Sequence, residues 1–348
     1  MGIQTLSLWR WNFTVSSFSK FLYSIGAVLF LLSFSITCYY AYQIFNFGNK
    51  AETATASKPR YHFVLVPEEL DNDYWRLVEN GAKEAAKDLN VVLEYIGPKQ
   101  ANTEEHIRTL EMAAVSRVDG ILTQGLQEEQ FTPLINQIVE KGIPVITVDT
   151  DAITSKRLSY VGTDNYYSGF IAGQALIEDT GGNANVAIIT GNFNASHQQL
   201  RVQGFKDAIQ HAEGIDIIAI EESNITRVRA AEAANRILKE HPEITAFYGT
   251  SALDGIGIAQ VVEHYQKQDQ VYILAFDTIE DTIQYMRRGT IDATVMQEPY
   301  KMGYQSVQMM IDLIERRSVP NTVHTKTRVI RVQDLPLDSR SIIRMDPS

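Results

Sequence analysis

The stretch PVITVDTD, residues 144–151, is a run of apolar and β-branched residues that ends in two carboxylates. Such a run is typical of a strand buried on both faces, with Asp149 and Asp151 at its carboxyl end. VYILAFDT, residues 271–278, repeats the arrangement with Asp277. Because a buried carboxylate costs free energy unless it is hydrogen-bonded, we expect these acids to face a cleft and not the core.

Strand-like and helix-like segments alternate along the chain on both sides of this stretch. We expect strands at 61–67, 91–96, 119–124, 144–149, 185–191, 215–222, 244–250, 271–277 and 292–297. We expect helices at 74–89, 103–116 (with Thr103 as N-cap), 131–142, 166–182, 198–212, 227–242, 255–266, 279–289 and 301–317. Apolar strands separated by helices form parallel sheets covered on both faces. The two runs, separated by a crossover segment at 158–165, predict an α/β fold of two doubly wound parallel-sheet lobes.

The composition excludes several classes of protein. The 348 residues carry a formal net charge of −11, which argues against a nucleic-acid surface because phosphate binding needs concentrated Lys and Arg. Cys38 is the only cysteine, so neither a disulfide framework nor a multi-cysteine metal site can form. The seven histidines have no metal-binding spacing, and His197, near a strand end, is expected on the surface. DGIGIAQ, residues 254–260, lacks the third glycine of a dinucleotide fingerprint, so we expect no dinucleotide cofactor. Together these features predict no metal, no cofactor and no nucleic-acid partner.

Residues 21–42, FLYSIGAVLFLLSFSITCYYAY, are long and apolar enough to cross the hydrocarbon core of a membrane as one helix. Arg10 and Lys20 precede this segment and place residues 1–20 in the cytoplasm, because positive charge favours the cytoplasmic side. The sequence therefore predicts a single-pass protein of the cell membrane whose remaining residues lie outside the cytoplasm.

Residues 43–60 are mostly polar or small and predict a linker between membrane and domain. A cleaved signal peptide is the alternative to an anchor. The apolar segment is longer than the usual core of a signal peptide, and the nearest small-residue cleavage site, Ala54-Thr55-Ala56, lies well beyond its end. These features favour an anchor that stays attached.

Polar and aromatic residues follow the ends of the predicted strands. In open parallel sheets, ligands bind beyond the carboxyl ends of the strands. The segments that stand there are VPEELDNDYW (66–75), ILTQG (121–125), VDTD (148–151), IITGNFN (188–194), YGTS (248–251), AFD (275–277) and VMQEP (295–299). The hydroxyl groups of a polyol are suitable partners for such side chains.

Six segments are together more specific than any one alone. They are LDNDYW (70–75), IPVITVDTD (143–151), VGTDNYYSGFIAG (161–173), RVQGF (201–205), ILAFDT (273–278) and ATVMQEPYKMGYQSV (293–307). In this order they resemble the type I periplasmic sugar-binding proteins, the group that binds ribose, galactose and xylose. The effector domains of lac-repressor-type regulators share the fold.

The resemblance covers residues 61 to about 333 and implies a hinge at which the chain crosses three times between two lobes. Lobe one would comprise residues 61–163 and 298–325, and lobe two residues 164–297 and 326–348. The ligand would lie between the lobes, and hinge closure would trap it.

The resemblance also implies how lobe one holds a ligand. Asn72 would hydrogen-bond a hydroxyl group, and Tyr74 and Trp75 would stack on a sugar ring, whose C–H face suits the negative face of an aromatic ring. Asp149 would accept hydrogen bonds from two hydroxyl groups, because charged acceptors form the stronger hydrogen bonds. Gln124 occupies a position where relatives often carry Asn.

Further ligand positions are implied on the opposite side of the cleft. Arg201 would donate to ring or hydroxyl oxygens, and Asp277 would mirror Asp149. Gln297, at the last crossover from lobe two, would both donate and accept. Thr250 stands where the family often has Asn.

Three departures from the family pattern imply a pocket that differs from that of a ribose binder. Thr150 and Ser251 replace an Arg and an Asp that are frequent in the family, and Ile225 stands near a position that is often aromatic. Glu68 near the cleft entrance adds a carboxylate that either contacts the ligand or is solvated. The expected ligand class is therefore a monosaccharide or related polyol, without a specific member.

Each of these residues also has a purely structural alternative. Asn72, Asp149 and Asp277 could cap helices. Tyr74 and Trp75 could pack in the core, Arg201 could lie on the surface or in an ion pair, and Gln297 could close a turn.

The leading hypothesis is an extracytoplasmic solute-binding protein that delivers its ligand to an ABC permease or docks on a membrane sensor histidine kinase. A transcriptional regulator is disfavoured because the hydrophobic segment replaces the expected helix-turn-helix head. A glycosidase would use Asp149 and Asp277 as paired carboxylates, but neither has an evident activating partner, so we expect no enzyme and no catalytic residue. A binder of inositol or a furanosyl signal molecule remains an alternative.

Overall fold

The computed structural model describes residues 17–53 and 59–335, in two units that divide after Lys58 and are treated separately. In the first unit, helix α1 (Ser17–Thr53) contains a segment, Lys20–Gln43, that is long and apolar enough to cross a membrane. The helix continues into the stretch expected as a linker. Residues 1–16 of the expected cytoplasmic segment, and the alternative cleavage site at 54–56, lie outside the described residues.

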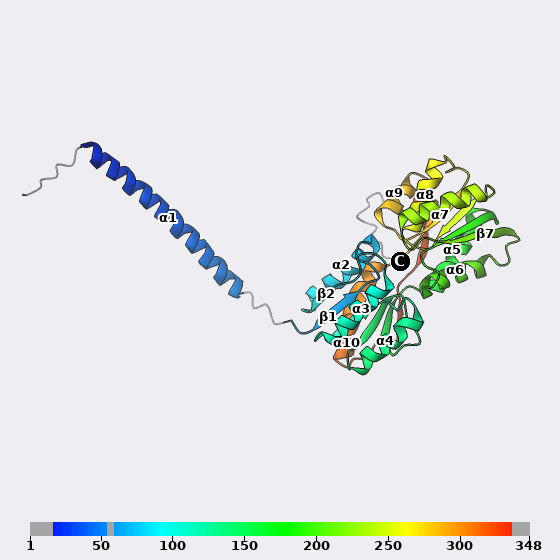
Figure 1. Cartoon of the computed structure of the whole chain (residues 1–348), viewed down its shortest axis with the longest axis horizontal. Coiled ribbons are helices and arrows are strands. Elements are labelled where there is room, and N and C mark those ends of the chain that lie inside the picture. Colours follow the sequence, from blue (N-terminus) through cyan, green and yellow to red (C-terminus); the bar gives the residue numbers. More distant parts are fainter. Residues whose placement is uncertain (1–16, 54–58, 336–348) are drawn as a thin grey trace, which may run out of the picture. The chain divides into compact units, whose positions relative to one another are not determined.

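The second unit contains two six-stranded sheets (Figure 1). Sheet A has the order β11-β5-β4-β3-β1-β2 and is parallel throughout. Its strands are β1 (His62–Val66), β2 (Val92–Tyr95), β3 (Gly120–Thr123), β4 (Val145–Asp149), β5 (Ser159–Gly162) and β11 (Thr322–His324). Its helices are α2 (Asp73–Asp88), α3 (Thr103–Val115), α4 (Glu128–Glu140) and α10 (Pro299–Ile314). We call sheet A and these helices lobe one.

Both faces of sheet A are covered, which explains its uniformly apolar strands. Phe63 and Leu65 pack with residues of α2 and α10, whereas Val64 and Val66 pack with residues of α3 and α4. Successive residues of a strand point to opposite faces, so a strand between two helix layers must be apolar at every position.

Sheet B has the order β12-β10-β9-β8-β6-β7, with β12 antiparallel to β10 and the other pairs parallel. Its strands are β6 (Asn183–Thr190), β7 (Gly214–Glu222), β8 (Ala246–Gly249), β9 (Tyr272–Phe276), β10 (Ala293–Met296) and β12 (Arg328–Arg331), followed by the 3-10 turn η1 (Val332–Asp334). Its helices are α5 (Asn165–Asp179), α6 (Ser196–Ile209), α7 (Arg227–Glu240), α8 (Asp254–His264) and α9 (Glu280–Arg287). Helices α5 and α6 cover one face and α7, α8 and α9 the other. We call this half lobe two.

The chain passes between the lobes at three connections, β5 to α5, β10 to α10, and β11 to β12. The predicted fold of two parallel-sheet lobes with a three-crossover hinge is thus confirmed. The predicted lobe boundaries fall within these three connections, and the division itself stays a prediction. Residues 336–348, assigned to lobe two, lie outside the described part of the chain.

Some local expectations were wrong. The segment 158–165 was expected as a plain crossover but contains β5, a fully buried strand. Asn102, and not Thr103, caps α3, because its side chain accepts from the backbone N–H of Glu105 at 3.0 Å. The short strands β11 and β12 were not expected, since three or four residues show too little periodicity for a strand to be recognised.

Helices α5 and α6 pack closely, and this contact sets the position of one cleft residue. A Cβ atom at Gly169 of α5 would lie 2.0 Å from the carbonyl oxygen of Arg201 on α6. A larger residue at position 169 would therefore displace the backbone that carries the Arg201 side chain.

Candidate functional site

A cavity of about 40 Å³ lies between the two lobes, at the carboxyl ends of their strands. Its lining residues are Glu68, Asn72, Tyr74, Trp75, Asp149, His197, Gln198, Arg201, Ile225, Ser251, Ala252, Asp277 and Gln297. Of the predicted site residues, Gln124 and Thr250 do not line the cavity, and the others do.

Asp149 and Asp277 occupy equivalent positions, at the ends of β4 and β9. Each has a φ of 66°, in the left-handed region, which Asp adopts more readily than most residues. Both side chains are buried against the cavity. The helix-cap alternative does not apply to Asp277, since Ile279 is the N-cap residue of α9.

Asp149 is held by three side chains of lobe one. The Tyr74 hydroxyl donates to Oδ1, while Gln124 Nε2 and Thr150 Oγ1 donate to Oδ2 at 3.0 and 2.9 Å. Gln124 also accepts from the backbone N–H of Glu68 at 2.7 Å. The geometry therefore makes Gln124 a positioning residue for Asp149.

Arg201 is a buried hub of lobe two and not a surface residue. Its Nε donates to Asn165 Oδ1 at 2.9 Å, and its Nη1 donates to the Thr250 carbonyl oxygen at 2.8 Å. Its Nη2 donates to Gln297 Oε1 at 3.3 Å. The guanidinium also lies over the ring of Phe276, 3.9 Å from the centroid. These contacts hold a fixed positive charge beside the cavity.

Gln297 links Asp277 to the hinge. Its Nε2 donates to Asp277 Oδ1 at 2.7 Å, and its Oε1 accepts from the Thr163 hydroxyl and from Arg201. Burial raises the pKa of Asp277 to about 7, although the charge of Arg201 opposes the rise. Burial of this acid carries a desolvation cost, and only strong hydrogen-bond donors offset it.

The residues at the start of α2 have structural and cavity roles together. Asn72 is the N-cap, accepting from the Tyr74 backbone N–H at 2.9 Å, and its amide donates to Glu69 Oε1 at 2.6 Å. Tyr74 and Trp75 belong to the core cluster of lobe one, in an edge-to-face pair with centroids 5.6 Å apart. Asn72 therefore caps a helix, and Tyr74 and Trp75 pack in the core, as the structural alternatives proposed. All three residues also line the cavity.

Thr250 was predicted as a ligand residue, but the residue that lines the cavity is its neighbour in the sequence, Ser251. The Thr250 hydroxyl donates to Gln198 Oε1 and lies 3.0 Å from Thr190 Oγ1, inside lobe two. Ser251 lines the cavity instead, and its buried hydroxyl has no hydrogen-bond partner within the described residues. Sequence position alone cannot tell which of two adjacent loop residues faces a cleft.

The expectation that His197 lies on the surface was wrong. His197 is buried in the first turn of α6, with Nδ1 3.1 Å from Thr150 Oγ1 of lobe one and Nε2 3.0 Å from Gln198 Nε2. Burial lowers the pKa of His197 to about 3, so the imidazole is neutral. Its spacing from Arg201 was an available signal, because residues four apart share a helix face. Among the described residues, no group of three or more His, Cys, Asp or Glu side chains could hold a metal ion.

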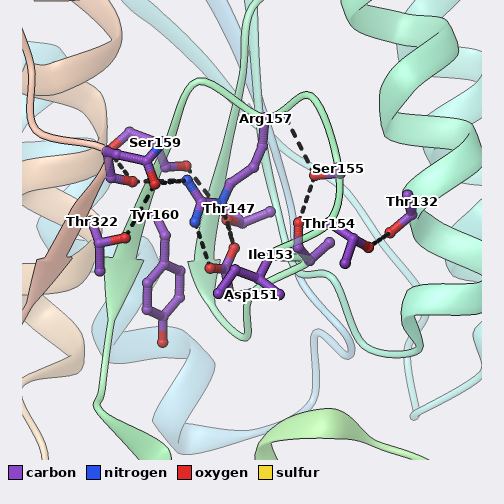
Figure 2. Close-up of polar contacts among 12 residues, drawn as sticks. Thr132, Thr147, Asp151, Ile153, Thr154, Ser155, Arg157, Ser159, Tyr160 and Thr322 are labelled. Atoms are coloured by element: carbon purple, nitrogen blue, oxygen red, sulfur yellow. Dashed lines mark hydrogen bonds and ion pairs between the residues drawn. The ribbon is translucent and has the colours of Figure 1, made fainter.

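Asp151 does not share the role of Asp149. It forms an ion pair with the buried Arg157, whose Nη2 lies 2.7 Å from Oδ2, and it accepts from Thr147 Oγ1 at 2.7 Å. Figure 2 shows Asp151 turned toward these two side chains. Arg157 also donates to Asn321, so the pair ties the β4–β5 loop to the segment before β11. Asp151 does not line the cavity of Asp149, but it lines a neighbouring hollow together with Asn165 and His197.

Ile225, at the cavity wall, has an unusual backbone conformation. Its φ is 52° and that of Asn224 is 49°. A β-branched residue rarely adopts a positive φ, and such strain is often found at ligand sites.

A model of the periplasmic binding protein domain matches residues 63–318. The chain belongs to the periplasmic binding protein family. The D-ribose/D-allose-binding protein of Pseudomonas aeruginosa is 25% identical over 269 residues, which cover 75% of this chain and 83% of that protein. The predicted resemblance to the type I sugar-binding group is confirmed, and the family places the chain with binding proteins and not with enzymes.

Solved structures extend the comparison. GanP, a glucose-galactose binding protein from Geobacillus stearothermophilus, is 63% identical, covers 80% of this chain and 99% of its own, and superposes with a TM-score of 0.78. XylFII, solved in a complex with LytSN, is 36% identical, covers 79% of this chain and 99% of its own, and has a TM-score of 0.76.

Proposed function

We propose that this protein is an extracytoplasmic receptor that captures a monosaccharide, with D-glucose and D-galactose the first candidates, in the cavity between its lobes. The observation that carries the proposal is the pair of buried carboxylates, Asp149 from lobe one and Asp277 from lobe two, on the wall of one cavity. Lobe closure would let both acids accept hydroxyl hydrogens of one ligand. The candidate sugars come from GanP, the 63% identical relative.

The remaining cavity wall supports a sugar. Tyr74 and Trp75 present aromatic surface to the apolar C–H face of a pyranose ring. Arg201 and Ser251 provide hydrogen-bond donors from lobe two. The predicted ligand residues Asn72, Tyr74, Trp75, Asp149, Arg201, Asp277 and Gln297 are proposed as direct contacts, with Gln124 and Thr250 as positioning residues.

A thermal-shift experiment tests the sugar. The full-length protein in detergent is heated with D-glucose, D-galactose, D-ribose, D-xylose or myo-inositol. A ligand at one hundred times its Kd adds about 2.7 kcal/mol of stability, and this raises the Tm of a domain of this size by a few degrees. We expect a shift with D-glucose or D-galactose. A shift with inositol alone, or with none of the five compounds, would contradict the proposal.

We further propose that the sugar-bound protein docks on a membrane sensor kinase and stays anchored by α1. The complex of XylFII with the sensor domain LytSN supports such a partner. An anchor fixed in the membrane suits a fixed partner, and Lys20–Gln43 has the length and composition of a membrane span. An ABC permease is the competing partner.

One capture experiment tests partner and anchor together. The protein, with a C-terminal tag, is purified from carbonate-washed membranes with and without D-galactose, and its intact mass is recorded. We expect the mass of the uncleaved chain and a sensor kinase that is recovered only with the sugar. A mass that begins after residue 56 would refute the anchor, and recovery of a permease would refute the sensor partner.

A further inference from the structure

Glu68 is the acid of the cavity that the protein itself leaves without a hydrogen bond. It follows β1, lines the cavity, and is 8% exposed. Its backbone N–H is bonded to Gln124, but within residues 17–53 and 59–335 its carboxyl group has no hydrogen-bond partner. Because the carboxyl group lines the cavity and is not engaged by the protein, a ligand that fills the cavity is within its reach.

The cavity already has more acceptors than donors on the side of lobe one. The hydroxyl of Tyr74 donates to Asp149, and the amide of Asn72 donates to Glu69. Ionised carboxylates accept hydrogen bonds but cannot donate them. A sugar ring oxygen likewise only accepts, so it needs a donor on the protein. A neutral carboxyl group at position 68 would therefore add a donor to a wall on which the Tyr74 hydroxyl is already engaged.

We propose that Glu68 binds the sugar as a neutral carboxylic acid and donates its proton in a hydrogen bond to a sugar oxygen. The inference rests on the proposed sugar-binding function and adds a specificity residue to it. The acid selects ligands that present an acceptor oxygen at this point of the cavity, and it makes affinity depend on pH.

The surroundings of Glu68 favour the neutral form. Burial first, then the carboxylates of Glu69 and Asp149, raise its pKa to about 8, while Arg201 lowers it. The protonated acid is therefore present below about pH 8 and is lost as the pH rises through that value. Other cavity groups change little between pH 7.5 and 9.5, because His197 is already neutral and the pKa of Tyr74 is raised far above this range. Asp277, with its pKa about 7, is mostly ionised at pH 7.5.

Calorimetric titration of the full-length protein in detergent with D-galactose and D-glucose, from pH 7.5 to 9.5, tests the proposal. We expect the Kd of the wild type to rise roughly 20-fold across this range, because each pH unit above the pKa removes about nine-tenths of the protonated form. Glu68→Gln keeps a donor that cannot ionise. Its Kd should lie within about threefold of the wild type at pH 7.5 and stay constant to pH 9.5.

Glu69→Gln is the control, because Glu69 is the adjacent buried acid but bonds Asn72 and does not line the cavity. Its affinity should still fall with pH, but the fall should begin at a lower pH than in the wild type, because the Glu69 charge no longer raises the pKa of Glu68. A wild-type Kd that changes less than threefold would overturn the proposal, even if no variant folds. So would a Glu68→Gln curve that follows the wild type, or a Glu69→Gln curve that becomes flat. If neither sugar binds at pH 7.5, the proposed function fails, and this inference fails with it.

Discussion

Asp149→Asn is expected to weaken sugar binding by a factor on the order of 10 to 10². Three protein side chains already bond the carboxylate, so it has room for one ligand hydroxyl group. A hydrogen bond to an ionised acceptor contributes about 1.5–3 kcal/mol, and an amide presents only one oxygen acceptor in place of two. The amide oxygen would keep the bond from Gln124 Nε2, which now donates to Asp149 Oδ2 at 3.0 Å, and the amide nitrogen would then face the Tyr74 hydroxyl, which would have to accept in place of donating. Calorimetric titration with D-galactose or D-glucose measures the loss.

Asparagine is the sharper replacement because of the backbone at this position. The φ of Asp149 is 66°, which asparagine tolerates and alanine tolerates poorly. A loss of affinity in Asp149→Asn therefore reports the missing carboxylate and not backbone strain.

Asp151→Asn is the matched control, two residues further along the same loop. This change leaves the buried guanidinium of Arg157 without its counter-charge, and we expect it to destabilise the protein by about 3 kcal/mol. Sugar affinity, measured well below the lowered Tm, should stay within about threefold of the wild type. Equal losses of affinity in both variants would show that the loop, and not the Asp149 carboxylate, determines binding.

The fold was largely predictable because its strands are buried on both faces. Continuous runs of apolar and β-branched residues such as 145–148 identify strands of a parallel sheet, and the intervening helical periodicity identifies the layers that cover them. The short strands β5, β11 and β12 carry no such signal. They are strands because sheet neighbours offer hydrogen bonds at those places, which a single sequence does not show.

The candidate site was predictable where a residue ends an apolar strand, as Asp149 and Asp277 do. Which other residues face the cavity depends on loop conformation and helix orientation, which the sequence does not show. Ser251 and not Thr250 reaches the cavity because the loop after β8 turns the Thr250 hydroxyl toward Thr190. His197 is buried because the first turn of α6 faces lobe one, where Thr150 meets it. Glu68 could be noticed in the sequence, but its burial and its lack of a partner emerge only from packing.

Arg201→Met is expected to abolish measurable sugar binding and to lower stability. Methionine fills much of the volume but leaves the Asn165 side-chain oxygen and the Thr250 carbonyl without their donor. Unsatisfied buried groups cost about 1–3 kcal/mol each, so we expect a loss of about 3 kcal/mol. The lost positive charge also removes the influence that lowers the pKa values of Glu68 and Asp277, so both acids would be more protonated at neutral pH. Affinity should fall at least 100-fold, because an ionised Asp277 and a direct donor are lost together.

Two further variants separate charge from geometry at this position. Arg201→Lys keeps a positive charge, but an ammonium cannot reproduce the planar arrangement of donors that reaches α5 and the segments after β8 and β10. It should recover part of the stability while binding sugar at least tenfold more weakly than the wild type.

Arg236→Met is the surface control, since Arg236 is half exposed and pairs with Glu221. This change should lower the stability of the protein by less than about 1 kcal/mol and leave the sugar affinity unchanged. Thermal unfolding and calorimetric titration of the three variants give both quantities. Full affinity in Arg201→Lys would mean that the charge alone suffices, and wild-type stability in Arg201→Met would mean that the network does not hold the cavity together.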